Sequence, residues 1–345
     1  MMSGRGTANG KVILFGEHAV VHGVPALAVG IDRGAAAEAT ALDAGPSTLT
    51  VREWNVTVKD DEGESTPLAR ALHDLLELTR SEQRAQGSTP VGFVRVDATA
   101  TLPPGGGLGC SAAIGVAVAR AIDPSANADA VAARAMAWER VFHGNPSGID
   151  AAVSARGGCV MFQRTAPVLG EAPHSAPPRS SIERVRLPSP LHLCVGHSGH
   201  ASSTKTMVDA VAKLLERRPD TTRKTFDAIH TVVKNARLAI EAGDTKAIGQ
   251  LLDLNQMLLA GLFLSTPEIE QLCASARGAG ALGAKLTGAG GGGCVVALVD
   301  DASRADDVLA AWKGDGFDGF RATVGDADAN ASNHAAPRIF AGSSP

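Results

Sequence analysis

The sequence predicts an α+β protein of two domains, on the strength of three observations. The chain has 345 residues, more than the roughly 250 to 300 at which a single hydrophobic core stops growing. Its second half mixes strand-like and helix-like segments without the strict βαβα alternation of a doubly wound sheet. A glycine-rich loop at residues 103–113 joins a predicted strand to a predicted helix. We therefore expect two mixed domains, with this loop in the first.

The first half of the chain is rich in short apolar runs separated by turn residues, which favours β structure. Leucine and alanine then recur on one helical face, and an alternating run follows before the glycine loop. The expected strands lie at residues 11–15, 48–52, 54–58 and 94–101, with a further apolar segment at 20–31. The expected helices lie at 67–79, 111–122 and 129–143, with another beginning near residue 147 after a Gly-Asn-Pro turn.

The second half begins after a stretch at residues 164–181 that is rich in proline, serine and alanine, which is typical of a domain boundary. We place the domains at residues 1–185 and 186–325, followed by a loose tail at 326–345 that lacks periodicity. Long amphipathic patterns predict most of this half to be helical. Strands are expected at 191–195, 294–299 and 319–324, and helices at 202–218, 221–242, 245–264, 267–278 and 304–313.

Composition narrows the class of protein. Hydrophobic residues make up 44% and charged residues 20% of the chain, and the net charge is −4, so there is no basic footprint for nucleic acid. No run of about 18 apolar residues and no signal-peptide core is present, so no membrane partner is expected. The five cysteines have no metal-type spacing. A cytoplasmic location is the simplest interpretation.

The loop at residues 103–113 is the first candidate site. A glycine loop before a helix leaves backbone N–H groups free at the helix N-terminus, where the peptide dipoles favour an anion. It has neither the Gly-Lys-Ser/Thr ending of a P-loop nor the glycine spacing of a dinucleotide fingerprint, and a plain flexible connection is the alternative. The candidate phosphate-binding residues are Pro104, Gly105, Gly106, Gly107, Leu108, Gly109, Cys110, Ser111 and Ala112.

A second glycine run at residues 288–293 formally satisfies G-x-G-x-x-G. A strand follows it, whereas the dinucleotide fingerprint must open a helix, which argues against NAD or FAD. Five glycines in six residues exceed what a hairpin turn needs, so we expect another backbone or a ligand to come very close. An ordinary turn remains the alternative.

Several charged residues could carry chemistry, and each has an ordinary structural explanation. Glu139 lies in the predicted helix 129–143 and could belong to a solvated face, and Asp150 could complete a capping box with Ser147. Lys11 opens the first strand, where a surface lysine is commoner than a catalytic one. Glu17 and His18 could be turn residues, and the segment 197–205 could be a second anion site or a capped helix start.

Taken together, four stretches resemble the GHMP kinase superfamily, most closely its mevalonate kinase family. They are residues 10–23 (GKVILFGEHAVVHG), 103–113 (PPGGGLGCSAA), 139–150 (ERVFHGNPSGID) and 285–294 (KLTGAGGGGC). The two glycine motifs specify only the superfamily, whereas the GEHAVVHG and HGNPSGxD segments carry the narrower assignment. The match extends in order over about residues 10 to 299.

The resemblance implies a fold, ligands and residue roles. It implies an N-terminal domain like domain 2 of ribosomal protein S5 and a ferredoxin-like C-terminal domain, with ATP and substrate in the cleft between them. It implies that Ser111 and Glu139 bind Mg²⁺ and that Asp150 faces the C5 hydroxyl of mevalonate with Lys11 beside it. The residues it places on the substrate side are Lys11, Glu17, His18, Asp150, Ser198, Gly288 and Ala289.

These implied roles suit phosphoryl transfer, which asks a protein to position the reactants and neutralise charge. Lysine beside an aspartate favours the ionised acid, which can accept a hydroxyl proton or orient the alcohol. Two positions depart from the pattern. Cys110 stands where relatives often have a serine, and His197-Ser198-Gly199 stands where they often have Asp-Thr-Gly, which puts roles drawn from that loop in doubt.

The expected activity is ATP-dependent phosphorylation of (R)-mevalonate to 5-phosphomevalonate in isoprenoid biosynthesis. A sister kinase acting on phosphomevalonate, homoserine or a sugar is the first alternative. A non-catalytic nucleotide-dependent binding protein is the second, although the joint presence of Lys11, Ser111, Glu139 and Asp150 speaks against it. Dimers are common among relatives, so a homodimer is one open possibility for the assembly.

Overall fold

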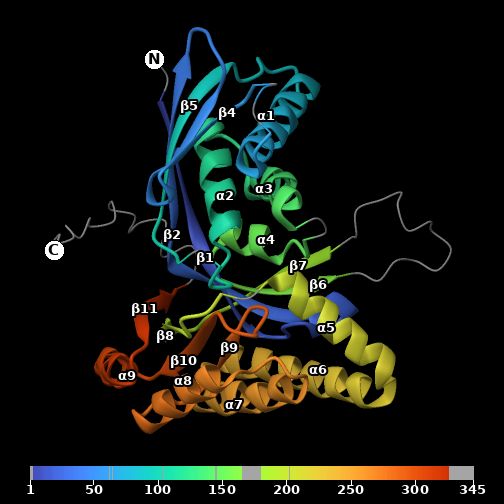
Figure 1. Cartoon of the computed structure of the whole chain (residues 1–345), viewed down its shortest axis with the longest axis vertical. Coiled ribbons are helices and arrows are strands. Elements are labelled where there is room, and N and C mark those ends of the chain that lie inside the picture. The colour runs from blue at the N-terminus through green and yellow to red at the C-terminus, as the bar shows by residue number, and fades with distance from the viewer. Residues whose placement is uncertain are drawn as a thin grey trace.

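The described strands form two sheets, and the second sheet lies across the lower end of the first in Figure 1. The computed structural model describes residues 3–61, 63, 65–103, 105–143, 146–164, 180–201 and 203–325. A single cluster of buried apolar side chains runs from the first sheet into the second. The expected α+β class is therefore correct, and the two sheets are not isolated from each other.

The first sheet holds the strands of the N-terminal half in the order β4-β3-β5-β2-β6-β7, with β1 paired to β2. All its pairings are antiparallel except the parallel pairing of β3 with β5. The strands are β1 (Ser3–Phe15), β2 (Ala26–Leu42), β3 (Thr48–Val51), β4 (Val56–Lys59), β5 (Phe93–Ala100), β6 (Cys159–Arg164) and β7 (Ser180–Val185). Two short 3₁₀ helices, η1 (Ala19–His22) and η2 (Arg52–Trp54), interrupt them.

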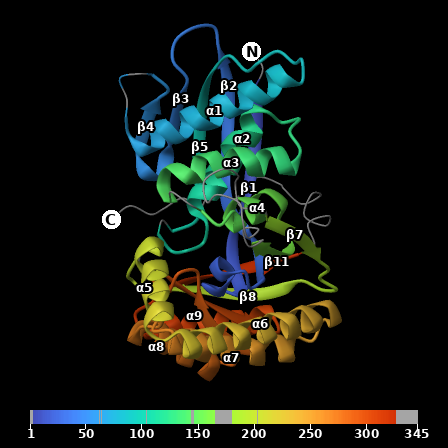
Figure 2. The ribbon, with the colours of Figure 1, turned by 90° about the vertical axis from the view of Figure 1, so that its right-hand side faces the viewer.

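The described residues of this half form four α-helices: α1 (Pro67–Ala85), α2 (Cys110–Ile122), α3 (Ala128–His143) and α4 (Ile149–Arg156). The first three lie on one face of the sheet (Figures 1 and 2). Helix α2 packs directly on β1, where a Cβ at Gly4 or Gly6 would collide with the backbone carbonyls of Ala121 and Ala117. This close packing fixes the helix that follows the glycine loop.

Strand β1 is longer than its apolar pattern predicts. The expectation was a strand at residues 11–15, whereas β1 already begins at Ser3. Gly4 and Gly6 hide this part of the strand from a sequence pattern, because glycine usually indicates a turn. Here the missing side chains allow the backbone of α2 to pack closely on β1. The apolar segment 20–31 is likewise divided into η1 and the start of β2.

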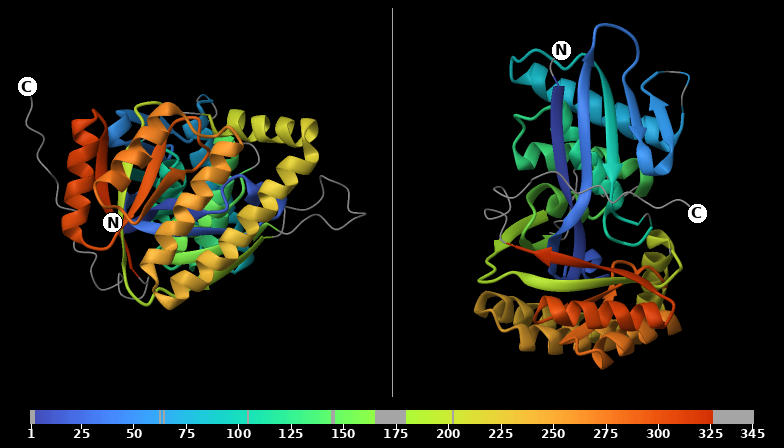
Figure 3. Two further views of the ribbon diagram at one scale, coloured as in Figure 1. Left: turned by 90° about the horizontal axis from the view of Figure 1, so that it is seen from below. Right: turned by 90° about the vertical axis from the view of Figure 1, so that its left-hand side faces the viewer.

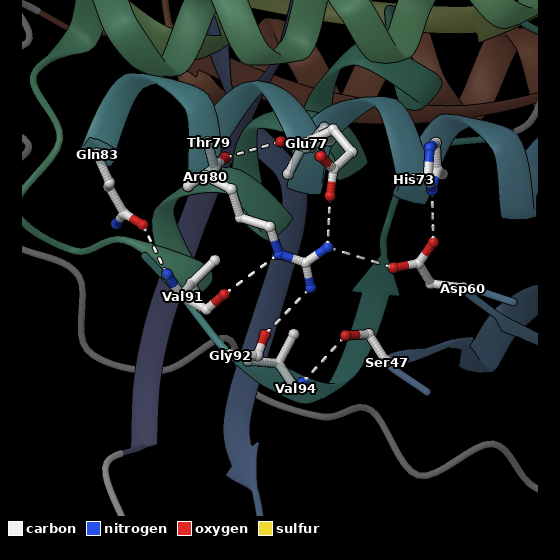
Figure 4. Close-up of polar contacts among 11 residues, drawn as sticks. Ser47, Asp60, His73, Glu77, Thr79, Arg80, Gln83, Val91, Gly92 and Val94 are labelled. Atoms are coloured by element: carbon white, nitrogen blue, oxygen red, sulfur yellow. Dashed lines mark hydrogen bonds and ion pairs between the residues drawn. The ribbon is translucent and has the colours of Figure 1, made fainter. Parts of the chain in front are cut away.

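Helix α1 continues six residues beyond the expected end at residue 79, to Ala85. A polar cluster, shown in Figure 4, ties this part of the helix to the chain that leads into β5. The guanidinium of Arg80 donates to the carbonyls of Val91 and Gly92 at 3.2 and 3.3 Å and pairs with Glu77 at 2.7 Å. Its distance to Asp60 is 3.7 Å. The cluster anchors α1 at the end of the molecule remote from the second sheet.

The second sheet is antiparallel throughout and has the order β11-β8-β10-β9. Numbered within this unit, the order is fourth, first, third, second, that of a ferredoxin-like sheet. Helices cover the face that points away from the first sheet (Figure 3, left). The elements are β8 (Leu191–His197), α5 (Thr204–Arg217), α6 (Pro219–Ala242), α7 (Thr245–Gly261), α8 (Pro267–Gly278), β9 (Gly283–Thr287), β10 (Cys294–Val299), α9 (Ala302–Gly314) and β11 (Asp318–Val324).

The sequence pattern did not indicate strands β6, β7 and β9. Strands β6 and β7 flank residues 165–179, which lie outside the described residues, as does the expected tail at 326–345. The first sheet ends at Val185 and the second begins at Leu191; the domain division at residues 185 and 186 stays a prediction. Among the described helices, none is both long and apolar enough to cross a membrane.

Candidate active site

The glycine loop between β5 and α2 has a backbone that only glycine adopts readily. Gly105, Gly107 and Gly109 have φ values of +73°, +74° and +70°, in the left-handed region. Gly109 is the N-cap of α2, and no side chain among the described residues caps that helix. Its first N–H groups are therefore open to an anion. Pro104, also expected here, lies outside the described residues.

The second glycine run comes directly against this loop. A Cβ at Gly107 would lie 3.3 Å from the carbonyl oxygen of Thr287, and one at Gly288 would lie 3.2 Å from the Cα of Gly107. A Cβ at Gly106 would lie 3.1 Å from the sulfur of Cys294. The run is thus a close backbone approach between the two sheets, and the glycines at both places are required for it.

Lys11 links the first strand to this loop and to an acid. Its backbone N–H donates to the carbonyl of Leu108 at 2.8 Å, and its ammonium Nζ donates to the carbonyl of Gly107 at 3.3 Å. Nζ lies 2.6 Å from Oδ1 of Asp150, with only 4% of the lysine side chain exposed. One buried ammonium therefore touches both the loop and the carboxylate.

Asp150 is held near the start of α4 without serving as its cap. The N-cap is Gly148, with φ +90°, and it has no side-chain capping bond within the described part of the chain. The hydroxyl of Ser147 accepts the N–H of Ile149 at 3.4 Å, so the alternative capping box between Ser147 and Asp150 is not formed. The Asp150 side chain, 35% exposed, pairs with Lys11 and also reaches solvent.

Ser111 and Glu139 form a second oxygen pair at the start of α2. The Ser111 hydroxyl donates to Oε1 of Glu139 at 2.6 Å and accepts the indole N–H of Trp138 at 3.2 Å. Glu139 is 2% exposed, and burial, followed by the nearby charge of Asp150, raises the pKa of Glu139 to about 7. His143 Nε2 lies 3.5 Å from its other oxygen. The solvated-face alternative for Glu139 is thereby excluded.

This pair fits a hard divalent cation. Mg²⁺ prefers oxygen ligands and keeps most of its shell as water and substrate phosphate. Ser111 offers a hydroxyl oxygen and Glu139 a carboxylate; among the described residues, no cluster of three or more His, Cys, Asp or Glu could hold a metal. A cation would also stabilise the ionised form of a buried carboxylate.

Glu17 lies at the junction of the two sheets, and its carboxylate is fully engaged. It is 1% exposed, forms an ion pair with the ammonium of Lys285, and accepts the side-chain N–H of Asn255 at 3.2 Å. Burial is the main influence on its pKa and raises it, while Lys285 opposes that shift. The structure thus places Glu17 beside the residues expected on the substrate side, with its charge directed into the interior.

His18 follows and is 7% exposed. Its Nε2 lies 2.7 Å from the carbonyl oxygen of Ala289; since a carbonyl only accepts, Nε2 carries the proton. Burial lowers the pKa of His18, which favours the neutral ring. Nδ1 is then an acceptor. His18 and Ala289, two of the residues expected on the substrate side, are therefore in direct contact.

Ser198 lies where the end of β8 meets the second glycine run. Its N–H donates to the carbonyl of Gly293 at 2.9 Å and its hydroxyl donates to the carbonyl of His200 at 3.2 Å. The N–H of Gly293 in turn donates to His200 at 2.7 Å. Ser198 is 3% exposed, so in this structure it braces the loop.

Cys110 contributes its backbone and not its thiol. The sulfur lies 3.7 Å from the carbonyl of Leu102. Burial raises the pKa of the thiol to about 11, so it stays protonated.

Sequence reasoning missed Lys285 and Trp138. Lys285 is 0% exposed within β9. The available signal was a lone lysine in a segment of apolar and small residues, since lysine is almost never fully buried unless paired. Trp138 had no comparable signal, because its position in an amphipathic helix reads as core packing.

Two family models match the chain. The model described as GHMP kinases N terminal domain matches residues 69–158, which include the glycine loop and the acids Glu139 and Asp150. The model described as GHMP kinases C terminal matches residues 236–318, which include β9 and the second glycine run.

Whole-chain comparisons agree with these models. The mevalonate kinase of Thermococcus sibiricus is 34% identical over 328 residues, covering 89% of this chain and 92% of that protein. The mevalonate kinase of Thermococcus onnurineus is 32% identical over 316 residues, covering 86% and 89%. A crystal structure of L. major mevalonate kinase in complex with R-mevalonate has a TM-score of 0.75 at 28% identity, covering 93% of this chain and 95% of that one.

Proposed function

This chain belongs to the mevalonate kinase family of the GHMP kinases, and from that premise we propose that it phosphorylates (R)-mevalonate. The reaction transfers the γ-phosphoryl group of ATP to the C5 hydroxyl and gives 5-phosphomevalonate and ADP, a step of isoprenoid biosynthesis. Both the fold and the arrangement of the site support this activity.

The observation that carries the proposal is the position of Lys11. Its ammonium lies 2.6 Å from Asp150 and 3.3 Å from the carbonyl of Gly107, so it joins the acid that would meet the alcohol to the loop that would hold the phosphates. Phosphoryl transfer needs these two sites side by side. A binding protein without catalysis would have no need for a carboxylate beside the phosphate loop at this point.

Each proposed role follows from the chemistry of the group. The amides of residues 105–112 would bind the phosphates of ATP, and Asp150 would accept or orient the proton of the C5 hydroxyl. Ser111 and Glu139 would hold Mg²⁺, which when bound neutralises charge on the phosphates. Lys11 would hold Asp150 in place through their ion pair and add positive charge beside the transferred group.

The substrate side would be built from the junction between the sheets. His18 would offer its Nδ1 lone pair to a substrate hydroxyl, and the backbones of Gly288 and Ala289 would line the same region. Ser198 would act by bracing this loop, and Glu17 by holding the turn that carries His18. These assignments rest on the contacts described above and on the family resemblance.

The direct test is an ADP-release assay with mevalonate, phosphomevalonate, homoserine and galactose as separate acceptors. We expect turnover with mevalonate to exceed that with each other alcohol. Asp150→Asn serves as the inactive control. Preferential turnover of another acceptor would assign the chain to a sister activity, and ATP binding without turnover of any acceptor would favour a non-catalytic role.

We further propose a cytoplasmic homodimer. All five cysteines are free and buried, as suits a reducing compartment, and the dimer follows from the resemblance alone. Light scattering on the purified protein tests the assembly; a mass near the 35.1 kDa of one chain would exclude the dimer.

A further inference from the structure

His18 occupies a backbone conformation that is rare for any residue with a side chain. Its φ is +59° and its ψ is −48°, and the N–H of Ala19 donates to the carbonyl of Glu17 at 2.6 Å. A hydrogen bond across one residue with these angles defines the strained, positive-φ form of the γ-turn. Such strain persists only where the surroundings over-determine it. Contacts on either side of the turn must therefore hold it.

Those contacts come from β9 and the loop that follows it. On one side of the turn the carboxylate of Glu17 pairs with the ammonium of Lys285. At its centre the ring of His18 bonds to the carbonyl of Ala289 at 2.7 Å. Lys285 and Ala289 are four residues apart. One short segment, formed by β9 and the loop after it, therefore contacts both Glu17 and His18.

The Glu17–Lys285 pair is suited to fixing a position. The two residues are 1% and 0% exposed, and removal from water disfavours both charges. Burial raises the pKa of Glu17 and lowers that of Lys285, while their attraction opposes both shifts. A buried pair of this kind contributes little net stability compared with a neutral one, but leaves a costly unpaired charge if one partner is removed.

Strand β9, which carries Lys285, is itself held firmly. The side-chain oxygen of Gln256 accepts the N–H of Leu286 at 2.9 Å. The hydroxyl of Thr287 accepts the N–H of Ile13 at 3.0 Å and donates to its carbonyl at 3.1 Å. The side-chain N–H of Asn255, next to Gln256 on α7, donates to Oε2 of Glu17, the carboxylate oxygen that does not pair with Lys285. The strand that carries Lys285 is therefore hydrogen-bonded both to α7 in its own half and to β1 of the first sheet.

We propose that Glu17 and Lys285 are positioning residues: together with the carbonyl of Ala289 they form a clamp between the two sheets that holds the His18 turn and fixes its imidazole as the Nε2–H tautomer. The clamp aims Nδ1 of His18 at the substrate. Its effect on substrate binding rests on the proposed function, whereas its effect on the tautomer does not.

The test is the double variant Glu17→Gln/Lys285→Met, which replaces the ion pair by a neutral pair of similar size. We expect its Tm to be closer to that of the wild type than the Tm of Lys285→Met alone. We expect the KM for mevalonate to rise at least tenfold while the KM for ATP stays within twofold. In ¹⁵N-histidine-labelled protein, two-bond ¹H–¹⁵N correlation spectra should show the Nε2–H form of His18 in the wild type and a mixture of tautomers in the double variant.

Arg134→Met is the matched control, because Arg134 is 2% exposed and pairs with Glu82 and Asp123 at 2.7 and 2.9 Å, away from the turn. It should lower the Tm without changing the mevalonate KM or the His18 spectrum. A double variant with wild-type KM and a pure Nε2–H signal would overturn the proposal, as would an equal KM rise in Arg134→Met.

If the double variant does not fold, Asn255→Leu removes only the outer contact to Glu17. A two- to threefold rise in KM with partial loss of the Nε2–H form is expected, and an unchanged spectrum would again overturn the clamp. Should the wild type not phosphorylate mevalonate, the tautomer measurement still decides the proposal, so its failure is distinguishable from failure of the proposed function.

Discussion

Nζ of Lys11 lies 2.6 Å from Oδ1 of Asp150, and the two side chains differ sharply in exposure, at 4% and 35%. The lysine is thus a buried, fixed charge, while the acid opens toward solvent, where a substrate can reach it. Because of this difference in exposure, we expect substitutions of Asp150 and of Lys11 to affect activity differently.

Replacing Asp150 by asparagine should abolish most of the turnover and leave the fold intact. Asparagine keeps the size of the side chain but cannot accept a proton, and a positioned general base is worth roughly 10² to 10⁴ in rate. We expect kcat to fall by about that factor, with the KM for ATP within threefold of the wild type. Steady-state kinetics and a thermal melt measure both. Wild-type kcat in this variant would remove Asp150 from the catalytic assignment.

Replacing Lys11 by methionine should impair both binding and catalysis. The variant loses the ion pair with Asp150 and the contact with Gly107, so kcat/KM for mevalonate should fall at least about 100-fold. Lys313→Met, at the exposed end of α9, is the matched control and should stay within twofold. If both variants retained activity, the ammonium beside the loop would have no part in the reaction.

Lys11 and Asp150 belong to the part of the site that could be predicted from the sequence. Lys11, Ser111, Glu139 and Asp150 were assigned roles because each stands in a stretch that resembles the GHMP kinases, and the structure brings them together in two pairs. Most helices were predicted within a few residues, because an amphipathic pattern is local information.

The parts that sequence could not supply depend on long-range packing. The start of β1 was missed because Gly4 and Gly6 read as turn residues until α2 is placed over them. The partner of Glu17 was missed because Lys285 lies 268 residues further along the chain. The hydrophobic pattern of a segment reports its local secondary structure, so it cannot indicate an ion pair with a residue that far away in the sequence.

Glu139→Gln should stabilise the metal-free protein while removing a proposed Mg²⁺ ligand. The pKa of Glu139 is raised from 4.5 to about 7, so the folded state binds its proton more tightly than the unfolded state, and Glu139 lowers stability as the pH rises from about 4.5 to about 7. The full gap corresponds to roughly 3 kcal/mol. Urea unfolding with EDTA should find the variant more stable by up to about that amount at pH 8 and by under about 1 kcal/mol at pH 5. A gap that does not change with pH would contradict this prediction.

The same carboxylate should make Mg²⁺ binding depend on pH. A proton and a cation compete for Glu139, so the Mg²⁺ concentration that gives half-maximal activity should rise as the pH falls below about 7. Nε2 of His143 lies 3.5 Å from Oε2 of Glu139, so His143→Gln serves as the control. The pH dependence should persist in His143→Gln; its disappearance would assign the effect to the histidine.

Gly107→Ala should weaken ATP binding beyond its effect on stability. A Cβ at Gly107 faces positive-φ strain, with φ +74°, and also meets the carbonyl of Thr287 at 3.3 Å, so the loop must move away from the second sheet. Gly87→Ala is the matched control, because its φ is +70° and nothing lies within 4 Å of the added Cβ. Both should lose roughly 1 to 2 kcal/mol of stability from the left-handed backbone. Only Gly107→Ala should also raise the KM for ATP, by about tenfold, since only there does the added methyl group displace the amides that we propose bind phosphate. Equal KM values in the two variants would separate the loop from nucleotide binding.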